Sequence, residues 1–331
     1  LDLDLNAEAD AQPDGAAPGS YPEHIFRAYD IRGNADEELT DELVTEIGKS
    51  IGTIAGEQGE QTLIVGCDGR LSSSRIKSAL IRALMDSGRD VVDIGLVPTP
   101  VLYFATRHLS YHSGVMVTGS HNPADYNGFK IVIDQQTIAA GGIQDLLQSI
   151  REENFVNGQG RMMREDVIPA YIDEVVADIA IGVPLKIVVD AGNGATSEIA
   201  PELFEELGCE VIPLHCELDG SFPNHPPDTS DEANLRDLIA AVKAHDADFG
   251  VAFDGDGDRL AVVSGSGNIV RSVVVLVFVA EGVVARDPGA VVVFVVVWRR
   301  NLARLWSGRG GRPGRWGGGR GFWWGEVAGA G

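Results

Sequence analysis

Short apolar runs alternate with amphipathic stretches from Tyr21 to about Val270, and this alternation constrains the fold more than any other feature. The apolar runs predict strands at residues 62–66, 90–94, 114–117, 129–133, 186–190, 210–214 and 249–253. The amphipathic stretches predict helices at residues 40–55, 73–87, 142–152, 167–179, 197–207 and 232–244. β-Branched runs separated by helical stretches indicate an α/β protein with βαβ units around mixed or parallel sheets.

The chain of 331 residues is long enough for two or three domains. Residues 1–20 are acidic and rich in Pro, Ala and Gly, which predicts a disordered linker and not a signal peptide. A first unit is expected at residues 21–166 and a second at 167–269, which ends in a hairpin with its turn at residues 265–268. Because the chain starts with Leu1, it is expected to be a piece of a longer protein.

Residues 270–331 have a different composition. They contain all five tryptophans, are rich in arginine and contain no lysine. Runs of valine and glycine there show neither strand alternation nor helix periodicity. A natural basic tail and a corrupted or artificial end of the sequence are the two interpretations, and the second is favoured.

The net charge of −23 argues against a nucleic-acid partner, because phosphate backbones repel an acidic surface. Small anions remain possible substrates, since a local basic pocket can override the overall charge. The three cysteines, Cys67, Cys209 and Cys216, show no metal-binding spacing and no disulfide framework. They are interpreted as reduced thiols of a cytoplasmic protein without a membrane segment.

Three carboxylates stand at alternate positions, Asp254, Asp256 and Asp258, separated by glycines and preceded by an apolar strand. Glycines let the chain curl so that the side chains converge, and converging carboxylates need a hard divalent cation such as Mg²⁺. An acidic turn is the simpler alternative. An EF-hand fits poorly, because its twelfth position would be Gly265 instead of glutamate.

The hexapeptide Thr-Gly-Ser-His-Asn-Pro at residues 118–123 follows a predicted strand. Gly119 and the Asn-Pro pair favour turns that present Ser120 on an exposed loop. A hydroxyl becomes a nucleophile only with a base or a metal, and adjacent residues such as Ser120 and His121 rarely meet on a bend. The nucleophile-elbow pattern is absent. By itself the hexapeptide is a loop more often than a site.

Several basic residues stand in otherwise acidic surroundings, namely Arg27, Arg32, Arg70, Lys130 and Arg259. Each alone is a solvated surface charge, but together they could form an anion pocket, because arginine matches phosphate oxygens in bidentate fashion. Lys130 could instead transfer a proton. No metal-ligand spacing connects the scattered histidines, which are His108, His112, His215, His225 and His245.

Three motifs in this order and spacing resemble the α-D-phosphohexomutase superfamily: Phe-Arg-Ala-Tyr-Asp-Ile-Arg-Gly at 26–33, the hexapeptide at 118–123, and Asp-Gly-Asp-Gly-Asp-Arg at 254–259. The first motif and Gly119 resemble the bacterial phosphomannomutase/phosphoglucomutase branch. The resemblance covers about residues 21–270. It implies repeated phosphoglucomutase-type α/β domains with mixed sheets, of which the first two are complete here.

The resemblance also implies the chemistry. Hexose 1- and 6-phosphates of mannose or glucose would be interconverted through a phosphoserine and a hexose 1,6-bisphosphate intermediate, by a monomer. The implied site residues are Ser120 as phosphate carrier and metal ligand, Asp254, Asp256 and Asp258 as Mg²⁺ ligands, Lys130 and Arg259 beside the reacting groups, Lys130 as a candidate acid/base, His121 near the phosphate, and Tyr29 and Arg32 at the border.

The end of the chain departs from the family pattern. The family's sugar-binding Gly-Glu-Met-Ser-Gly-His loop aligns with residues 325–330, where Glu326 is retained but alanines replace the serine and histidine. A third domain is therefore expected to be partial and degenerate, the fourth absent, and turnover impaired. Two alternatives stay open: a non-catalytic remnant that binds Mg²⁺ or sugar phosphate, and a phosphoglucosamine mutase.

Overall fold

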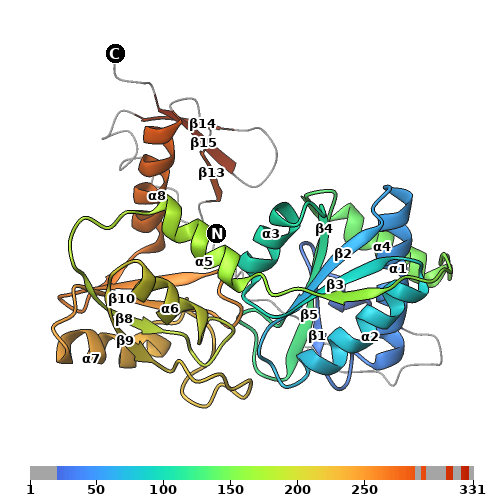
Figure 1. Ribbon diagram of the computed structural model, residues 1–331, viewed down its shortest axis with the longest axis horizontal. Helices are drawn as coiled ribbons and strands as arrows, with labels where there is room; N and C mark the ends of the chain where they lie inside the picture. Colours follow the sequence, from blue (N-terminus) through green and yellow to red (C-terminus); the bar gives the residue numbers. More distant parts are fainter. Residues whose placement is uncertain (1–20, 288–291, 296–310, 316–321, 328–331) are drawn as a thin grey trace, which may run out of the picture.

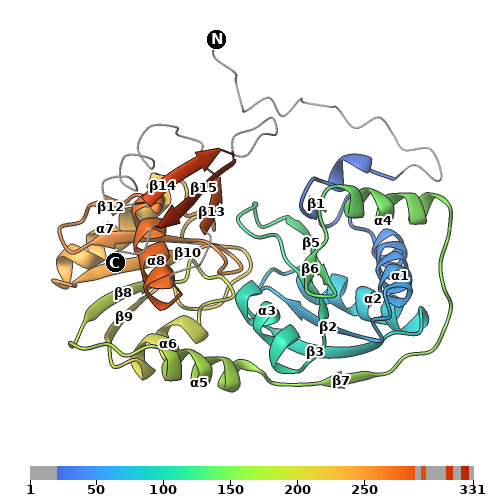
Figure 2. The same cartoon turned by 90° about the horizontal axis from the view of Figure 1, so that it is seen from above.

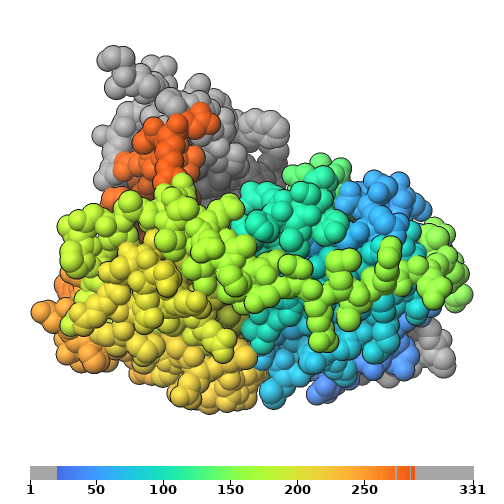
Figure 3. All heavy atoms as spheres, viewed as in Figure 1, coloured from blue at the N-terminus to red at the C-terminus, as the bar shows by residue number. Residues whose placement is uncertain are grey.

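The computed structural model describes residues 21–287, 292–295, 311–315 and 322–327. The segment 1–20, predicted as a disordered linker, lies outside the described residues. Two α/β bodies lie side by side, one formed by the blue and green part of the chain and one by the yellow and orange part (Figure 1). The segment from β7 (Met162–Arg164) to α5 (Ile168–Asp178) runs across both bodies (Figure 3).

The first body is built on a mixed sheet with strand order β1-β5-β4-β2-β3-β7, and β6 pairs with β5. The strands β2, β3, β4 and β7 are parallel, whereas β5 is antiparallel to β4 and to β1. The remaining strand bounds are β1 (Ile31–Asn34), β2 (Thr62–Cys67), β3 (Asp90–Leu96), β4 (Ser113–Val117), β5 (Tyr126–Ile133) and β6 (Gln136–Thr137).

Alternating side chains on each strand reach two different hydrophobic clusters, because successive residues of a strand point to opposite faces. Leu63 and Val65 of β2 pack in the cluster with α1 (Asp41–Glu57), α2 (Ser73–Asp86) and α4 (Gly141–Arg151). Ile64 packs on the other face with α3 (Thr99–His108). Figure 2 shows the resulting three layers.

The second body repeats this layering around a sheet of order β12-β11-β10-β8-β9. Helix α7 covers one face and α6 the other. Helix α5 joins the two bodies, because Ile172 shares a cluster with α3. The bounds are β8 (Lys186–Asp190), α6 (Ile199–Glu206), β9 (Glu210–Leu214), a 3₁₀ turn η2 (Glu232–Leu235), α7 (Arg236–Ala244), β10 (Phe249–Phe253), β11 (Leu260–Ser264) and β12 (Ile269–Val270).

The described part after residue 270 contains α8 (Ser272–Arg286) and a three-stranded antiparallel sheet of order β13-β15-β14. Its strands are β13 (Val292–Val295), β14 (Gly311–Arg315) and β15 (Phe322–Val327). The sequence showed no periodicity here, so no helix or strand was predicted. The structure corrects this prediction for the described residues. In the part of the chain that is described, no helix has the length and apolar character needed to cross a membrane.

The predicted strands and helices are present with shifts of a few residues at their ends, and the hairpin β11–β12 turns at residues 265–268 as expected. Helix α3 is the main element that the sequence pattern missed. It begins directly after Pro98, and Pro100 occupies its first turn. Proline interrupts an apolar pattern, yet it is tolerated at this position because the first helical N–H groups have no intrahelical partner.

Candidate functional site

Two loops from different bodies meet at the carboxyl ends of buried strands. Ser120 lies just after β4, and Asp254 lies just after β10. Ser120 Oγ donates a hydrogen bond to Asp254 Oδ2 over 3.2 Å. The backbone N–H of Thr99 donates to the carbonyl of Asp256 over 2.8 Å. The serine and the aspartates, more than 130 residues apart in sequence, therefore share one site.

The carboxylates of Asp254, Asp256 and Asp258 each place one oxygen within 4.8 Å of the others. Asp254 and Asp256 are fully buried. Burial, reinforced by the charges of Asp256 and Asp258, raises the pKa of Asp254 to about 7. Asp256 Oδ1 has no hydrogen-bond partner among the described residues. Three converging carboxylates, two of them buried, are the oxygen donor set that a hard divalent cation prefers, so the residues present fit Mg²⁺.

Lys130 extends from β5 into this carboxylate cluster. Its Nζ donates to Asp256 Oδ2 over 2.6 Å and also to Asp258 Oδ2. Burial alone would lower the pKa of Lys130, but Asp256 and Asp258 outweigh it, so the pKa is raised. In this arrangement Lys130 supplies the positive charge that neutralises part of the cluster.

Thr99 is a site residue that sequence analysis missed, because it belongs to the overlooked helix α3. Its hydroxyl donates to Asp256 Oδ2, and its N–H binds the Asp256 carbonyl. The hydroxyl is fully buried. Thr99 thus fixes both the backbone and the side chain of Asp256. The Thr-Pro step at the start of α3 was the available signal, since it places a hydroxyl at the first turn of a helix.

Ser120 is held by a buried network below its loop. Asp68 accepts hydrogen bonds from Thr118 Oγ1 over 2.8 Å and from the Gly119 N–H over 3.0 Å. Thr118 Oγ1 in turn accepts from the Ser120 N–H over 2.7 Å. Ser120 has φ +50°, in the left-handed region, and is only 3% exposed. The expectation of an exposed serine is therefore wrong, because the loop folds down over Asp68.

Arg70 clamps the same loop, which corrects its interpretation as part of an anion pocket. Nε donates to Asp68, and the two terminal nitrogens donate to four backbone carbonyls of the loop. The accepting carbonyls belong to Ser120, Asn122, Pro123 and Tyr126. All the N–H directions of the guanidinium are used, and its side chain is fully buried. Arg70 is thus a structural residue with no donor left for a ligand.

Arg32 lies at the wall of the site. It is 2% exposed, donates to the Thr118 carbonyl and forms an ion pair of 2.6 Å with Asp30. A cavity of about 220 Å³ opens beside Ser120. Its lining contains every expected site residue of the first two bodies except the two buried aspartates: Tyr29, Asp30, Arg32, Tyr103, Ser120, His121, Lys130, Thr137, Asp258 and Arg259. Tyr103 and Thr137 lie outside the sequence motifs, and Asp30 belongs to the motif at residues 26–33 but was given no role.

His121 Nδ1 lies 3.4 Å from Ser120 Oγ, so the two neighbouring side chains approach each other despite the bend. Burial lowers the pKa of His121, and the charge of Arg259 lowers it further. Glu326 is placed on β15 opposite Arg312, and its side chain lies outside the described part of the chain. Arg27 does not line the cavity beside Ser120.

Comparison with known proteins identifies the family. Two family models match the chain, "Phosphoglucomutase/phosphomannomutase, alpha/beta/alpha domain I" at residues 23–156 and the corresponding domain II at residues 169–267. The chain is 50% identical over 297 residues to a phosphomannomutase/phosphoglucomutase of Pseudomonas aeruginosa, covering 90% of this chain and 64% of the relative. It is 45% identical over 294 residues to a phosphoglucomutase of Neisseria gonorrhoeae, covering 88% and 64%.

A solved structure of a phosphoglucomutase/phosphomannomutase family protein from Burkholderia thailandensis aligns with a TM-score of 0.79 at 44% identity, over 82% of this chain and 61% of that one. The chain spans a little under two thirds of the length of these relatives. The family models, the identity of the relatives and the shared fold agree on one assignment. The chain belongs to the phosphoglucomutase/phosphomannomutase family, in the bacterial branch of the α-D-phosphohexomutase superfamily.

Proposed function

We propose that this chain takes part in the interconversion of hexose 1-phosphate and hexose 6-phosphate, the intramolecular phosphotransferase reaction of a phosphomannomutase/phosphoglucomutase. The observation that carries the proposal is the hydrogen bond of Ser120 Oγ to Asp254, which places a nucleophile against a cluster of three carboxylates. The names of relatives at 45–50% identity support it.

Asp254, Asp256 and Asp258 would hold the metal ion together with an oxygen on Ser120. When bound, Mg²⁺ would neutralise charge on the transferring phosphoryl group. The carboxylate oxygens, the orphaned Asp256 Oδ1 and the hydrogen bond to Ser120 support this ligand set. The Thr99 hydroxyl orients the Asp256 carboxylate, and the Lys130 ammonium offsets part of its negative charge.

In the proposed reaction, phosphorylated Ser120 donates its phosphoryl group to a sugar hydroxyl. The hydroxyl oxygen forms a bond to phosphorus while the bond from phosphorus to Ser120 Oγ breaks, which produces a hexose 1,6-bisphosphate. After the sugar reorients, its other phosphoryl group returns to Ser120 Oγ. Such a transfer depends mainly on positioning and charge neutralisation, which a preorganised site supplies.

The remaining cavity residues take roles that follow from their positions. Tyr29 and Arg32 border the space in which a sugar phosphate would lie, and Arg259 and His121 stand beside Ser120 in the same lining. Lys130 remains a candidate for proton transfer to or from the sugar oxygen. That role requires its Nζ to leave Asp256 and Asp258.

The proposed division of labour follows the three parts of the chain. Residues 21–166 contribute the serine loop, residues 167–269 contribute the aspartate loop, and residues 270–331 form a partial third domain with Glu326. Hexose 1,6-bisphosphate is the proposed activator, because it can phosphorylate the resting serine.

Phosphorylation of Ser120 tests the proposal directly. After incubation with Mg²⁺ and glucose 1,6-bisphosphate, intact-mass measurement is expected to show one added phosphate. Ser120→Ala removes the attacking oxygen, so the rate of phosphate incorporation should fall more than about a thousandfold. Alanine adopts the left-handed backbone conformation of Ser120 about as readily as serine does, so we expect the loop to keep its geometry.

Ser78→Ala is the matched control, because Ser78 lies on α2 and its hydroxyl binds only the carbonyl of Ser74. This variant should take up phosphate like the parent chain. Phosphate retained by Ser120→Ala, or absent from the parent chain, would contradict the assignment of Ser120. A phosphorylated chain that does not convert glucose 1-phosphate would limit the function to phosphate transfer onto the serine.

Thr99→Val tests how the aspartate loop is positioned. Valine keeps the shape of threonine but removes the hydroxyl that donates to Asp256 Oδ2. We expect Mg²⁺ to bind about tenfold more weakly, because loss of a hydrogen bond behind a metal ligand typically costs about 10- to 100-fold in affinity. Isothermal titration calorimetry measures the affinity.

Thr106→Val provides the control on the same helix, since the Thr106 hydroxyl binds the backbone carbonyl of Tyr103 and none of the three carboxylates. Its Mg²⁺ affinity should equal that of the parent chain. Equal affinities for Thr99→Val and Thr106→Val would show that the Thr99 hydroxyl does not position the metal ligand.

A further inference from the structure

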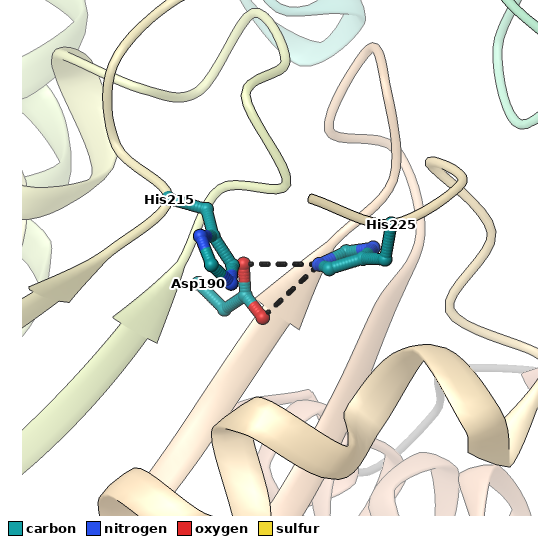
Figure 4. Close-up of side chains that lie close together, drawn as sticks. All are labelled: Asp190, His215 and His225. Atoms are coloured by element: carbon teal, nitrogen blue, oxygen red, sulfur yellow. Dashed lines mark hydrogen bonds and ion pairs between the residues drawn. The ribbon is translucent and has the colours of Figure 1, made fainter. Parts of the chain in front are cut away.

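A second cluster of side chains of the kinds that bind metal ions lies in the second body. Asp190 ends β8, His215 follows β9, and His225 belongs to the loop after it. One ligand atom from each lies within 4.8 Å of the others. Figure 4 shows both imidazole rings beside the Asp190 carboxylate, with the ring of His225 pointing at it. Sequence spacing gave these histidines no role, because their distance along the chain matches no ligand motif.

The distance between His225 and Asp190 differs from that of a charge-assisted hydrogen bond. His225 Nε2 lies 3.3 Å from Asp190 Oδ2 and 3.4 Å from Oδ1. Charge-assisted N–H···O bonds are typically about 2.7–2.9 Å long. Two ligand atoms that each lie about 2.0 Å from a tetrahedral ion are about 3.3 Å apart. The separation therefore suits two ligands of one ion.

The protonation pattern points the same way. His225 Nδ1 lies 2.8 Å from the Pro226 carbonyl, which can only accept, so Nδ1 carries a proton. Nε2 is then the nitrogen that faces Asp190 and needs a cation or a second proton between them.

Each ligand is already oriented and sheltered. Asp190 is fully buried and accepts the Gly192 N–H over 2.9 Å. The His215 and His225 side chains are 15% and 10% exposed. His215 Nε2 lies 3.2 Å from Asp237 Oδ2. The Pro226 carbonyl holds the other ring nitrogen of His225, which is the usual support of a ligating histidine. An ion would compete with Asp237 for His215 Nε2.

We propose that Asp190, His215 and His225 bind one divalent transition-metal ion of the zinc type. Two imidazole nitrogens and one carboxylate are a donor set that suits zinc, whereas Mg²⁺ prefers oxygen ligands. The site is separate from the Asp254 cluster, whose donors are oxygens alone. The inference does not depend on the proposed mutase reaction.

Such an ion would connect three segments that lie under the aspartate loop. The turn after Asp190 packs against that loop, because the Ala195 N–H donates to the Gly255 carbonyl over 3.0 Å. His225 lies so close to this turn that a β-carbon on Gly192 would be 3.1 Å from its ring. The expected role is structural: the ion would stiffen the loops that carry the proposed Mg²⁺ site.

Zinc titration of the full chain, with any affinity tag removed and Mg²⁺ in saturating excess, tests the proposal. The parent chain should bind one Zn²⁺. His215→Asn and His225→Gln should each weaken binding more than about tenfold, since each removes a ligand. Asparagine suits the left-handed backbone of His215, whose φ is +49°. Zinc should also raise the melting temperature of the parent chain but not of these variants.

Two control variants locate the ion. His112→Gln removes a ligand from the more exposed group of Glu60, His112 and Asp134, and Asp254→Asn alters the carboxylate cluster. Both should bind Zn²⁺ like the parent chain. A parent chain that binds no Zn²⁺, unchanged affinity in His215→Asn and His225→Gln, or loss of zinc in Asp254→Asn would each overturn the proposal.

Cobalt substitution gives a readout that needs no variant. Co²⁺ bound by two histidines and a carboxylate in a four-coordinate site should give visible absorption bands that Zn²⁺ displaces at one equivalent. Bands that Mg²⁺ displaces instead would assign the ion to the carboxylate cluster and refute the histidine site.

Discussion

Asp254→Asn is expected to abolish phosphorylation of Ser120 and weaken Mg²⁺ binding more than about tenfold, while it stabilises the metal-free chain. Asparagine keeps the shape and the carbonyl oxygen that accepts the Arg259 N–H over 3.1 Å. It removes a fully buried negative charge that faces two other carboxylates. Without a metal ion these charges repel one another, and Lys130 pairs with Asp256 and Asp258 but not with Asp254, so removal of the Asp254 charge favours the folded state.

The gain in the free energy of unfolding should be about 1 kcal/mol at pH 8 in the presence of a chelator, within the usual range for one substitution. Functional sites commonly trade stability for activity in this way. Urea denaturation measures the stability, calorimetry measures the Mg²⁺ affinity, and intact mass measures the phosphate. Asp173→Asn, at an exposed aspartate of helix α5, should change none of the three.

Loss of stability together with normal Mg²⁺ binding in Asp254→Asn would refute this account. It would show that Asp254 acts as a structural hydrogen-bond acceptor and not as a metal ligand. Unchanged stability with lost Mg²⁺ binding would retain the ligand role but would contradict the expected repulsion among the three carboxylates.

Arg70→Lys should destabilise the chain by about 3–5 kcal/mol, the usual cost of breaking a buried ion pair. Lysine offers three donors on a single nitrogen and cannot reach Asp68 and four carbonyls at once. Asp68 would then be left buried with a weakened partner. Arg70 also stacks on Phe222 of the second body, with 5.0 Å between the guanidinium carbon and the ring centre.

The urea midpoint of unfolding, followed by circular dichroism, measures this effect. Arg151→Lys is the matched control, because Arg151 pairs with Glu23 at the surface and such pairs contribute about 0–1 kcal/mol. An Arg70→Lys midpoint equal to that of the control would show that the clamp does not support the loop. Arg70 also packs closely under Gly119, where an added β-carbon on the glycine would lie 2.1 Å from Arg70 Nε. An unchanged midpoint would mean that this close packing does not contribute to stability either.

Local patterns predicted most elements of the two bodies because they report burial residue by residue. The β-branched runs form buried strands, β2 in the first sheet and β8 in the second. The amphipathic stretch forms α1, whose apolar face packs against the core. Helix α3 was not predicted, because its prolines interrupt the apolar pattern at a position where a helix tolerates them. Helix α8 was not predicted, because it has no polar face that would reveal a helical period in the sequence.

The sequence by itself determined the chemical types at the site: a serine after one strand and three aspartates after another, each on a glycine-containing turn. Only the tertiary structure decided which groups meet. It joined Ser120 to Asp254, turned Arg70 from a ligand candidate into a clamp, and brought Thr99 to Asp256. It also gathered Asp190, His215 and His225 from three segments. These contacts depend on strand order and on the docking of two sheets, which bring together residues whose separation along the chain carries no periodic signal.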